Sequence, residues 1–417
     1  MKIVFYSGAF ASNTYLQGRI ICPLAMYMML QGHDVHYEED INNIRKSKVL
    51  AYHDDLNVET IAKLKNNGNI IFAFDINDHS WLSYFYHSKP EALNIDYIFK
   101  SSGIQQKDSY EIYIDNEFNI TKKIRPFAPE HIQAIYSRFV EEDRIFPMPH
   151  LHWHEYKVTS HKSFDQRDNK TLVRGGHHFY RVILFLKLLL EGRVDGASGF
   201  AVRSYAENYC TECENRLKAI GIFVGNYREI QCSNSIEGWN SGQLPDNFFN
   251  INTGKWNNRC SPMYFRLIEL FQKCQGTIDM NTVNMAFNSS MLPVEYFYGL
   301  LGNVRFASDY KWIYSINLPP RFWEAAQAKT INYLPRRTND QKYFPHVEDG
   351  EHYLTFDDDM SDFSLMDRVT KEQYNHITNN LHNVFMQWIE PNDPDFKCNT
   401  NLLQHLSNII DTSNGIN

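Results

Sequence analysis

The sequence predicts an α/β protein built from two Rossmann-like domains that face each other across a cleft. Short apolar runs of strand length alternate with helical patterns in the first part of the chain, and the alternation restarts near residue 170. The length of 417 residues exceeds the size at which one hydrophobic core stops growing. We therefore expect two domains, each with a parallel sheet.

The first elements follow from local patterns. Residues 2–7, KIVFYS, have the length of a strand, and the apolar stretch at 23–30 predicts a helix. Gly32 is placed to end that helix, and a second strand begins at Asp34. Further strands are expected at 49–52 and 69–74, with a helix over 58–67 between them. Ligands of such a sheet bind beyond the carboxyl ends of its strands.

The second unit repeats this pattern. The polar stretch at 145–170 predicts a linker, followed by a strand at 170–176 and an apolar helix at 182–190. The α/β pattern continues at 221–224, 294–299 and 328–334, and a last long helix is expected at 371–388 before a short tail helix. We predict a first domain at 1–155, a second domain at 156–370, and C-terminal helices at 371–417 that pack back on the first domain.

Composition limits the function. A net charge of −8 gives no global electrostatic attraction for nucleic acid, so any polyanion would have to meet a local basic patch. Seven cysteines in a chain of this size indicate reduced thiols, and hence a cytoplasmic protein, rather than a disulfide framework. No apolar run reaches the length of a membrane span, and the N-terminal stretch does not read as a secretory signal.

Two stretches of the second half carry the expected chemistry. Gly175 and Gly176 follow a strand, and Arg181 lies just inside the next helix, so backbone amides and a guanidinium could meet a diphosphate. The alternative is a tight turn. Farther along, Arg321 and Glu324 share one helical face, where Glu324 could accept hydrogen bonds from ribose hydroxyls while Arg321 holds phosphate. The alternative there is a surface ion pair.

The Arg321 and Glu324 helix before a short strand, with the later stretch 347–354, resembles the nucleotide-sugar half of GT-B glycosyltransferases. Within that fold the chain is most similar to phage DNA β-glucosyltransferases, on residues 1–3, 72–76, the glycine pair with Arg181, and 321–324. The resemblance implies that the domain at 156–370 binds a UDP-sugar donor and that the domain at 1–155 lies on the acceptor side. It also implies no requirement for a divalent metal in binding, and no other cofactor. It implies an acceptor hydroxyl on 5-hydroxymethylcytosine in double-stranded DNA, and the host cytoplasm if the protein is phage-encoded.

The same resemblance places a catalytic base at Asp75, at the end of a first-domain strand. Transfer with inversion needs a group that takes the proton of the attacking hydroxyl, and positive charge near the departing diphosphate. An aspartate at a strand end can equally be a helix cap, and Asp78 with His79 resembles a loop of phage α-glucosyltransferases. Inverting and retaining mechanisms both stay open. So do two other functions: transfer to a surface polysaccharide, lipopolysaccharide or capsid glycan, and a non-catalytic binding module.

Other features are interpreted as structural or solvated. His150, His152 and His154 alternate along the chain but lack a further ligand at metal spacing, and Cys210 and Cys213 form a single pair. The acidic run 357–359 is typical of capping residues. A groove for DNA would need basic side chains from three stretches, with aromatic rings beside a flipped base. The candidates are Lys122, Lys123, Arg125, Lys157, Lys162, Arg167, Lys170, Arg174, Arg336 and Arg337, with Trp81, Tyr84 and Trp153 as the rings.

Overall fold

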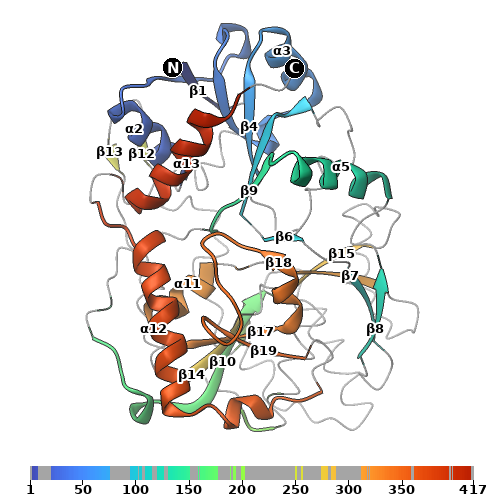
Figure 1. The fold of residues 1–417 in the computed structure, drawn as a ribbon, viewed down its shortest axis with the longest axis vertical. Coiled ribbons are helices and arrows are strands. Elements are labelled where there is room, and N and C mark those ends of the chain that lie inside the picture. The colour runs from blue at the N-terminus through green and yellow to red at the C-terminus, as the bar shows by residue number, and fades with distance from the viewer. Residues whose placement is uncertain are drawn as a thin grey trace.

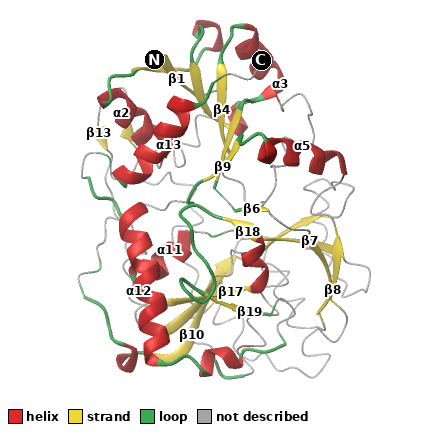
Figure 2. Cartoon of the chain, viewed as in Figure 1, coloured by secondary structure: helices red, strands yellow, loops and turns green. Residues whose placement is uncertain are grey.

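The computed structural model contains two parallel α/β sheets stacked along the long axis of the molecule (Figures 1 and 2). The structure describes residues 2–7, 20–75, 94–101, 103–105, 109–114, 120–125, 130–150, 158, 160–176, 188, 191–193, 199–201, 249–250, 255–256, 274–279, 283–287, 311–316, 318, 320–357, 361–393, 396 and 398–414. The two sheets confirm the predicted fold class, α/β with two Rossmann-like units.

The first sheet is parallel and has the order β2-β1-β3-β4-β5-β9. Its strands are β1 (Lys2–Tyr6), β2 (Asp34–Glu38), β3 (Lys48–Tyr52), β4 (Ile70–Asp75), β5 (Tyr97–Lys100) and β9 (Ile145–Pro147). The accompanying helices are α2 (Cys22–Leu30), α3 (Val58–Asn66) and α5 (Glu130–Glu141). Helix α2 ends as expected, because Gly32 adopts φ +87° and its amide donates to Met29 O.

Both faces of this sheet are buried, which explains the continuous apolar runs of its strands. On β4, Phe72 and Phe74 point into one core, and Ile71 and Ala73 into the other. Helices α2 and α13 (Thr400–Thr412) cover the first face, and α3 and α5 cover the second. The C-terminal helix therefore lies on the N-terminal sheet, and Lys48 at the start of β3 donates to Asp411 O at its end, 3.1 Å away.

The second sheet is also parallel, with the order β11-β10-β14-β17-β19. Its strands are β10 (Asp168–Gly176), β11 (Gly199–Ala201), β14 (Cys274–Asp279), β17 (Ile331–Pro335) and β19 (Leu354–Phe356). Helices α11 (Pro320–Gln327) and α12 (Lys371–Trp388) share its core through Phe322, Leu381 and Phe385. In each sheet the strand that comes first along the chain lies second, between the second and third strands.

Two antiparallel pairings join the halves. Strand β6 (Ile104–Gln105), which follows β5, pairs with β18 (Gln341–Lys342), which follows β17. The hairpin of β7 (Ser109–Ile114) and β8 (Ile120–Arg125) extends the hairpin of β15 (Val283–Phe287) and β16 (Lys311–Ile316). The short pair β12 (Phe249–Asn250) and β13 (Lys255–Trp256) forms a separate two-stranded sheet beside α2. Because β6 and β18 each leave the carboxyl end of a sheet strand, these two ends face each other.

The predicted linker at 145–170 is too long at both ends. Residues 145–147 form β9 at the edge of the first sheet, and β10 begins at Asp168. A three-residue strand is too short to show a period of two, so the sequence could not reveal it. The strands expected at 221–224 and 294–299 lie outside the described residues, as does most of the helix expected at 182–190. The domain boundaries stay a prediction.

Candidate active site at the facing strand ends

The first sheet brings polar side chains together at its carboxyl edge. His53 follows β3, Asp75 ends β4, Lys100 ends β5, and His150 lies three residues after β9. These four strands are neighbours in the sheet, so the four residues form a row along one edge. Ligands of doubly wound sheets bind outside this edge, next to the point where the strand order reverses, here between β1 and β3.

Asp75 has no exposed surface and lies beside a lysine that has none either. Lys100 Nζ is 3.2 Å from Asp75 Oδ2, and the two residues are paired in the register of β4 and β5. The backbone is held as well, because Ser101 N donates to Asp75 O at 2.9 Å. A buried carboxylate is stabilised in its charged form by a partner of opposite sign and by hydrogen-bond donors, and Lys100 supplies the opposite charge here.

His53 completes this cluster. Its imidazole is 1% exposed, and Nδ1 is 3.2 Å from Phe74 O and 3.9 Å from Asp75 Oδ1. A carbonyl oxygen only accepts, so Nδ1 carries the proton that it donates to Phe74 O. Neither His53 nor Lys100 was predicted from the sequence. Each is a polar residue at the end of an apolar strand, and this was the signal that could have found them.

The second sheet presents the glycine pair at the equivalent edge. Gly175 and Gly176 are the last residues of β10, paired with Phe200 and Ala201 of β11. Because β10 lies between β11 and β14, the reversal point of this sheet falls beside the glycines. Arg181 lies outside the described residues.

Helix α11 precedes β17, and a crossover helix of a parallel sheet begins near the carboxyl ends of the strands. Pro320 is its first residue and Arg321 lies in its first turn, with a side chain outside the described part of the structure. Glu324 is one turn farther along and only 1% exposed. The interpretation as a surface ion pair is therefore wrong, because Glu324 lies inside the protein.

The far end of α11 is held by three cationic or imidazole side chains. His382 donates to Ala326 O at 3.0 Å, His161 to Gln327 O at 2.9 Å, and Arg167 to Ala328 O at 2.9 Å. The two imidazoles meet edge to face with centroids 5.1 Å apart. Burial is the largest effect on the pKa of both histidines and lowers it, and the nearby Lys329 charge lowers it further.

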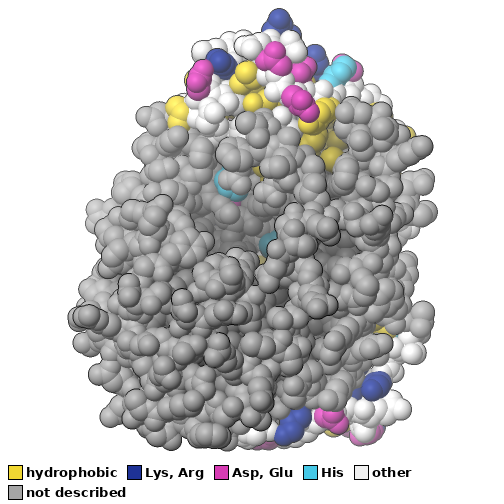
Figure 3. Space-filling model, turned by 180° about the vertical axis from the view of Figure 1, so that it is seen from behind, with side chains coloured by type: hydrophobic (Ala, Val, Ile, Leu, Met, Phe, Trp, Pro, Cys, Tyr) yellow, Lys and Arg dark blue, Asp and Glu magenta, His cyan; other side chains and the backbone are white. Residues whose placement is uncertain are grey.

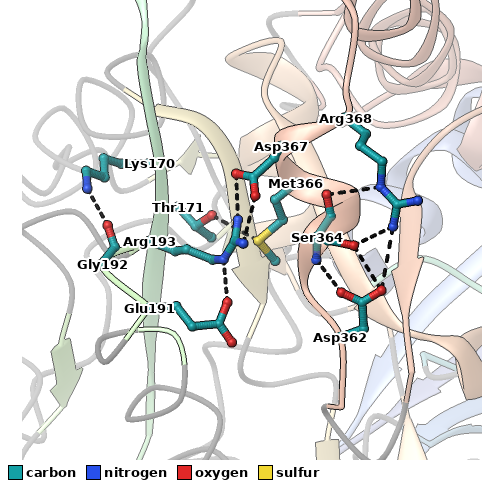
Figure 4. A network of polar contacts seen from close by, with 10 residues as sticks. All are labelled: Lys170, Thr171, Glu191, Gly192, Arg193, Asp362, Ser364, Met366, Asp367 and Arg368. Atoms are coloured by element: carbon teal, nitrogen blue, oxygen red, sulfur yellow. Dashed lines mark hydrogen bonds and ion pairs between the residues drawn. The ribbon is translucent and has the colours of Figure 1, made fainter.

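The amino edge of the second sheet, opposite the glycine pair, is closed by an ionic network (Figure 4). Arg193 donates to both carboxylate oxygens of Asp367 at 2.7 Å and to Glu191 at 2.5 Å. Thr171 N, near the start of β10, donates to Arg193 O at 2.7 Å. This network fixes the 191–193 turn to the short helix Ser364–Asp367. It lies at the opposite end of β10 from the glycine pair and so outside the candidate site.

Several basic residues considered for a DNA groove lie elsewhere. Arg167 is buried on the end of α11, and Lys170 lies near the start of β10, away from the glycine pair. Arg336 is an exception, because it directly follows β17 at the carboxyl edge of the second sheet, where it makes an ion pair of 3.1 Å with Asp357. Lys122 to Arg125 belong to β8, an edge strand of the sheet formed with β16. Other proposed contacts lie outside the described residues: Arg181, Lys157, Trp81, Tyr84, Trp153, His152, His154, Cys210, Cys213, Asp78 and His79.

The face turned away from the viewer in Figure 1 is hollowed about midway along the molecule, and histidine side chains are visible inside the hollow (Figure 3).

Within the described ranges, no three His, Cys, Asp or Glu side chains are grouped as metal ligands. The described helices include none that is both long and apolar enough to cross a bilayer. Cys22 and Cys398 are buried free thiols, and burial raises the pKa of each to about 12.

Comparison with known proteins finds similarity at the level of structure only. No protein-family model matches the chain, and no curated protein sequence matches it. Among solved structures, Anabaena HepE in complex with UDP is 9% identical, with 99% of this chain and 100% of that chain covered and a TM-score of 0.49. A glycosyltransferase from Rickettsia africae is 9% identical, covering 98% and 97% of the two chains, with a TM-score of 0.46. The fold assignment above rests on the strand order of the two sheets.

Proposed function

We propose that the protein is a glycosyltransferase that moves a sugar from a UDP-sugar to an acceptor hydroxyl. The observation that carries the proposal is the facing arrangement of two carboxyl edges. A glycine pair lies at the reversal point of one sheet, and a buried carboxylate lies on the edge of the other. One edge suits a diphosphate and the other suits proton removal, and transfer from a nucleotide-sugar needs both.

On the donor side, the amides of Gly175 and Gly176 with Arg181 and Arg321 would hold the diphosphate, and Glu324 the ribose hydroxyls. Bare glycine backbone lets an anion approach closely, and guanidinium groups neutralise the charge that develops on the leaving group. The placement of Gly175 and Gly176 beside the reversal point supports this assignment. In this proposal the donor residues bind the nucleotide-sugar, which is the substrate, without a resident cofactor or a divalent metal.

On the acceptor side, Asp75 would act as the base, with Lys100 keeping it charged and His53 packed beside it. Asp75 has no exposed surface, so it meets an acceptor only when the edge of the first sheet opens. The competing role of Asp75 is a purely structural ion pair with Lys100. Asp75→Asn combined with Lys100→Met separates the two roles, because it removes both buried charges together. A folded double variant that binds the donor but has lost turnover reports a base.

Two classes of acceptor follow from the residues. The resemblance to phage enzymes supports hydroxymethylcytosine in double-stranded DNA. The net charge of −8, and the positions of Arg167 and Lys170 away from the facing edges, favour a glycan hydroxyl of a surface polysaccharide, lipopolysaccharide or capsid. We favour the glycan acceptor on these charges, with the reaction in the cytoplasm.

The test is transfer of radiolabel from a panel of UDP-hexoses and UDP-pentoses. Each donor is incubated with hydroxymethylcytosine-containing DNA, with unmodified DNA, and with oligosaccharide and lipid-linked acceptors. Label in an oligosaccharide or lipid-linked product supports the favoured acceptor, and label only in the modified DNA selects the other. Label that stays in the donor with every acceptor contradicts the proposed function. Asp75→Asn with Lys100→Met, matched with Asp96→Asn at the amino end of β5, where Asp96 pairs with Lys65 at 2.8 Å, reports the base.

A further inference from the structure

The contact between Gly103 and Tyr343 joins the two halves beside the pairing of β6 with β18. Gly103 comes three residues after Lys100, just before β6, and Tyr343 directly follows β18. The β6 and β18 strands pair with Gln105 opposite Gln341 and Ile104 opposite Lys342. A backbone pairing therefore holds this contact in place from both sides.

The space at Gly103 admits no side chain. A β-carbon there would lie 2.5 Å from Gln341 Oε1, 2.9 Å from Tyr343 Cδ1 and closer still to Tyr343 Cε1. These distances are well inside van der Waals contact, so an added methyl group forces a neighbour to move. Gln341 has little freedom to do so, because it is buried and accepts a hydrogen bond from Tyr343 OH at 3.3 Å.

The ring of Tyr343 has no freedom either. It is 8% exposed and belongs to the core cluster that contains Phe322 and Trp323 of α11, next to Arg321. Burial raises the pKa of its hydroxyl well above the ordinary range, which keeps it neutral. Because the core cluster holds the ring, the strain is taken up by the short backbone segment between Lys100 and β6, on the acceptor side.

We propose that Gly103 is a positioning residue, whose close approach to Tyr343 sets the distance between the Asp75 edge and the donor edge. The inference rests on the proposed function and deepens it. An enzyme that transfers a group between substrates on two domains depends on this distance, and a misplacement of about 1 Å costs on the order of 100-fold in rate. The second pairing, β7 with β16, keeps the halves together when the first contact is strained.

The test is a kinetic cycle on the full chain. Gly103→Ala is expected to lower kcat by about 100-fold while KM for the nucleotide-sugar stays within about twofold, because the donor edge itself is intact. Tyr343→Leu removes the ring atoms that the methyl group strikes, so Gly103→Ala with Tyr343→Leu should recover most of the lost kcat. Tyr343→Phe is the matched control, because it loses only the hydroxyl and should not rescue.

Three results would overturn the inference. These are unchanged kcat in folded Gly103→Ala, an equal rise in donor KM, or equal kcat when Gly103→Ala is combined with Tyr343→Leu and with Tyr343→Phe. If the wild-type protein transfers no sugar at all, the proposed function fails and the contact is judged by unfolding alone. Gly103→Ala should then lower the melting temperature, and Tyr343→Leu but not Tyr343→Phe should offset that loss. Additive melting shifts in both double variants would refute the contact.

Discussion

Replacing Lys100 with methionine removes the cation beside Asp75 and leaves a carboxylate with no exposed surface. Both side chains are 0% exposed, and their charged atoms are 3.2 Å apart. Removal of one partner from a buried ion pair costs about 3–5 kcal/mol, because the remaining buried charge loses its partner of opposite sign. We expect Lys100→Met to lower the free energy of unfolding by that amount. Asp75→Asn together with Lys100→Met removes both charges and should recover much of the loss.

The assay is urea unfolding followed by circular dichroism at neutral pH. Lys63→Met serves as the matched control, since Lys63 pairs with Glu59 at 3.0 Å across one turn of α3 with 47% and 79% of the side chains exposed. Exposed pairs of this kind contribute about 0.3–0.5 kcal/mol. The reasoning is refuted if Lys100→Met costs no more than Lys63→Met, or if the double variant is no more stable than Lys100→Met.

Three further predictions concern stability. Burial lowers the pKa of His161 and His382, so below about pH 6.5 the unfolded chain binds more protons than the folded protein, and stability falls as the pH falls. His382→Gln should flatten this dependence of the melting temperature on pH between pH 7 and 5, and an unchanged slope would contradict the reasoning. Arg193→Lys should lower the melting temperature, since an ammonium cannot replace two parallel bonds to Asp367; equal melting refutes it. Leu406→Ala should cost about 2–5 kcal/mol in urea unfolding, because Leu406 is fully buried between α13 and the first sheet, and a cost below 1 kcal/mol would contradict that packing.

The sequence predicts those elements whose pattern is local. The helix at 371–388 is found at the predicted residues. Strand β4 begins one residue after its predicted start, because a strand buried on both faces appears in the sequence as a continuous apolar run. The pairings of β6 with β18 and β7 with β16 were not predicted. They join residues more than 190 positions apart along the chain, and no local pattern records such a partner.

In the candidate site, too, the sequence predicts what depends on local pattern and not what depends on contacts between distant segments. Asp75 was placed at a strand end from sequence, and it is the last residue of β4. Lys100 could be identified as a polar residue at a strand end, but not as the neighbour of Asp75, because the order of strands in the sheet decides that β4 and β5 are adjacent. The sequence also does not show that Glu324 is buried. Charged residues three apart on a helix usually face solvent, and only the packing of α12 on α11 shows otherwise.

The measurement that most directly tests the central claim is calorimetric titration of the protein with UDP and a panel of UDP-sugars. The account predicts binding to the wild-type chain, and loss of binding in Gly176→Val, whose side chain would occupy the edge of β10 beside the reversal point. Unchanged far-ultraviolet circular dichroism of the variant shows that the loss is local. No binding of any nucleotide-sugar at millimolar concentration, or equal binding to the wild-type chain and Gly176→Val, would contradict a donor site at this edge.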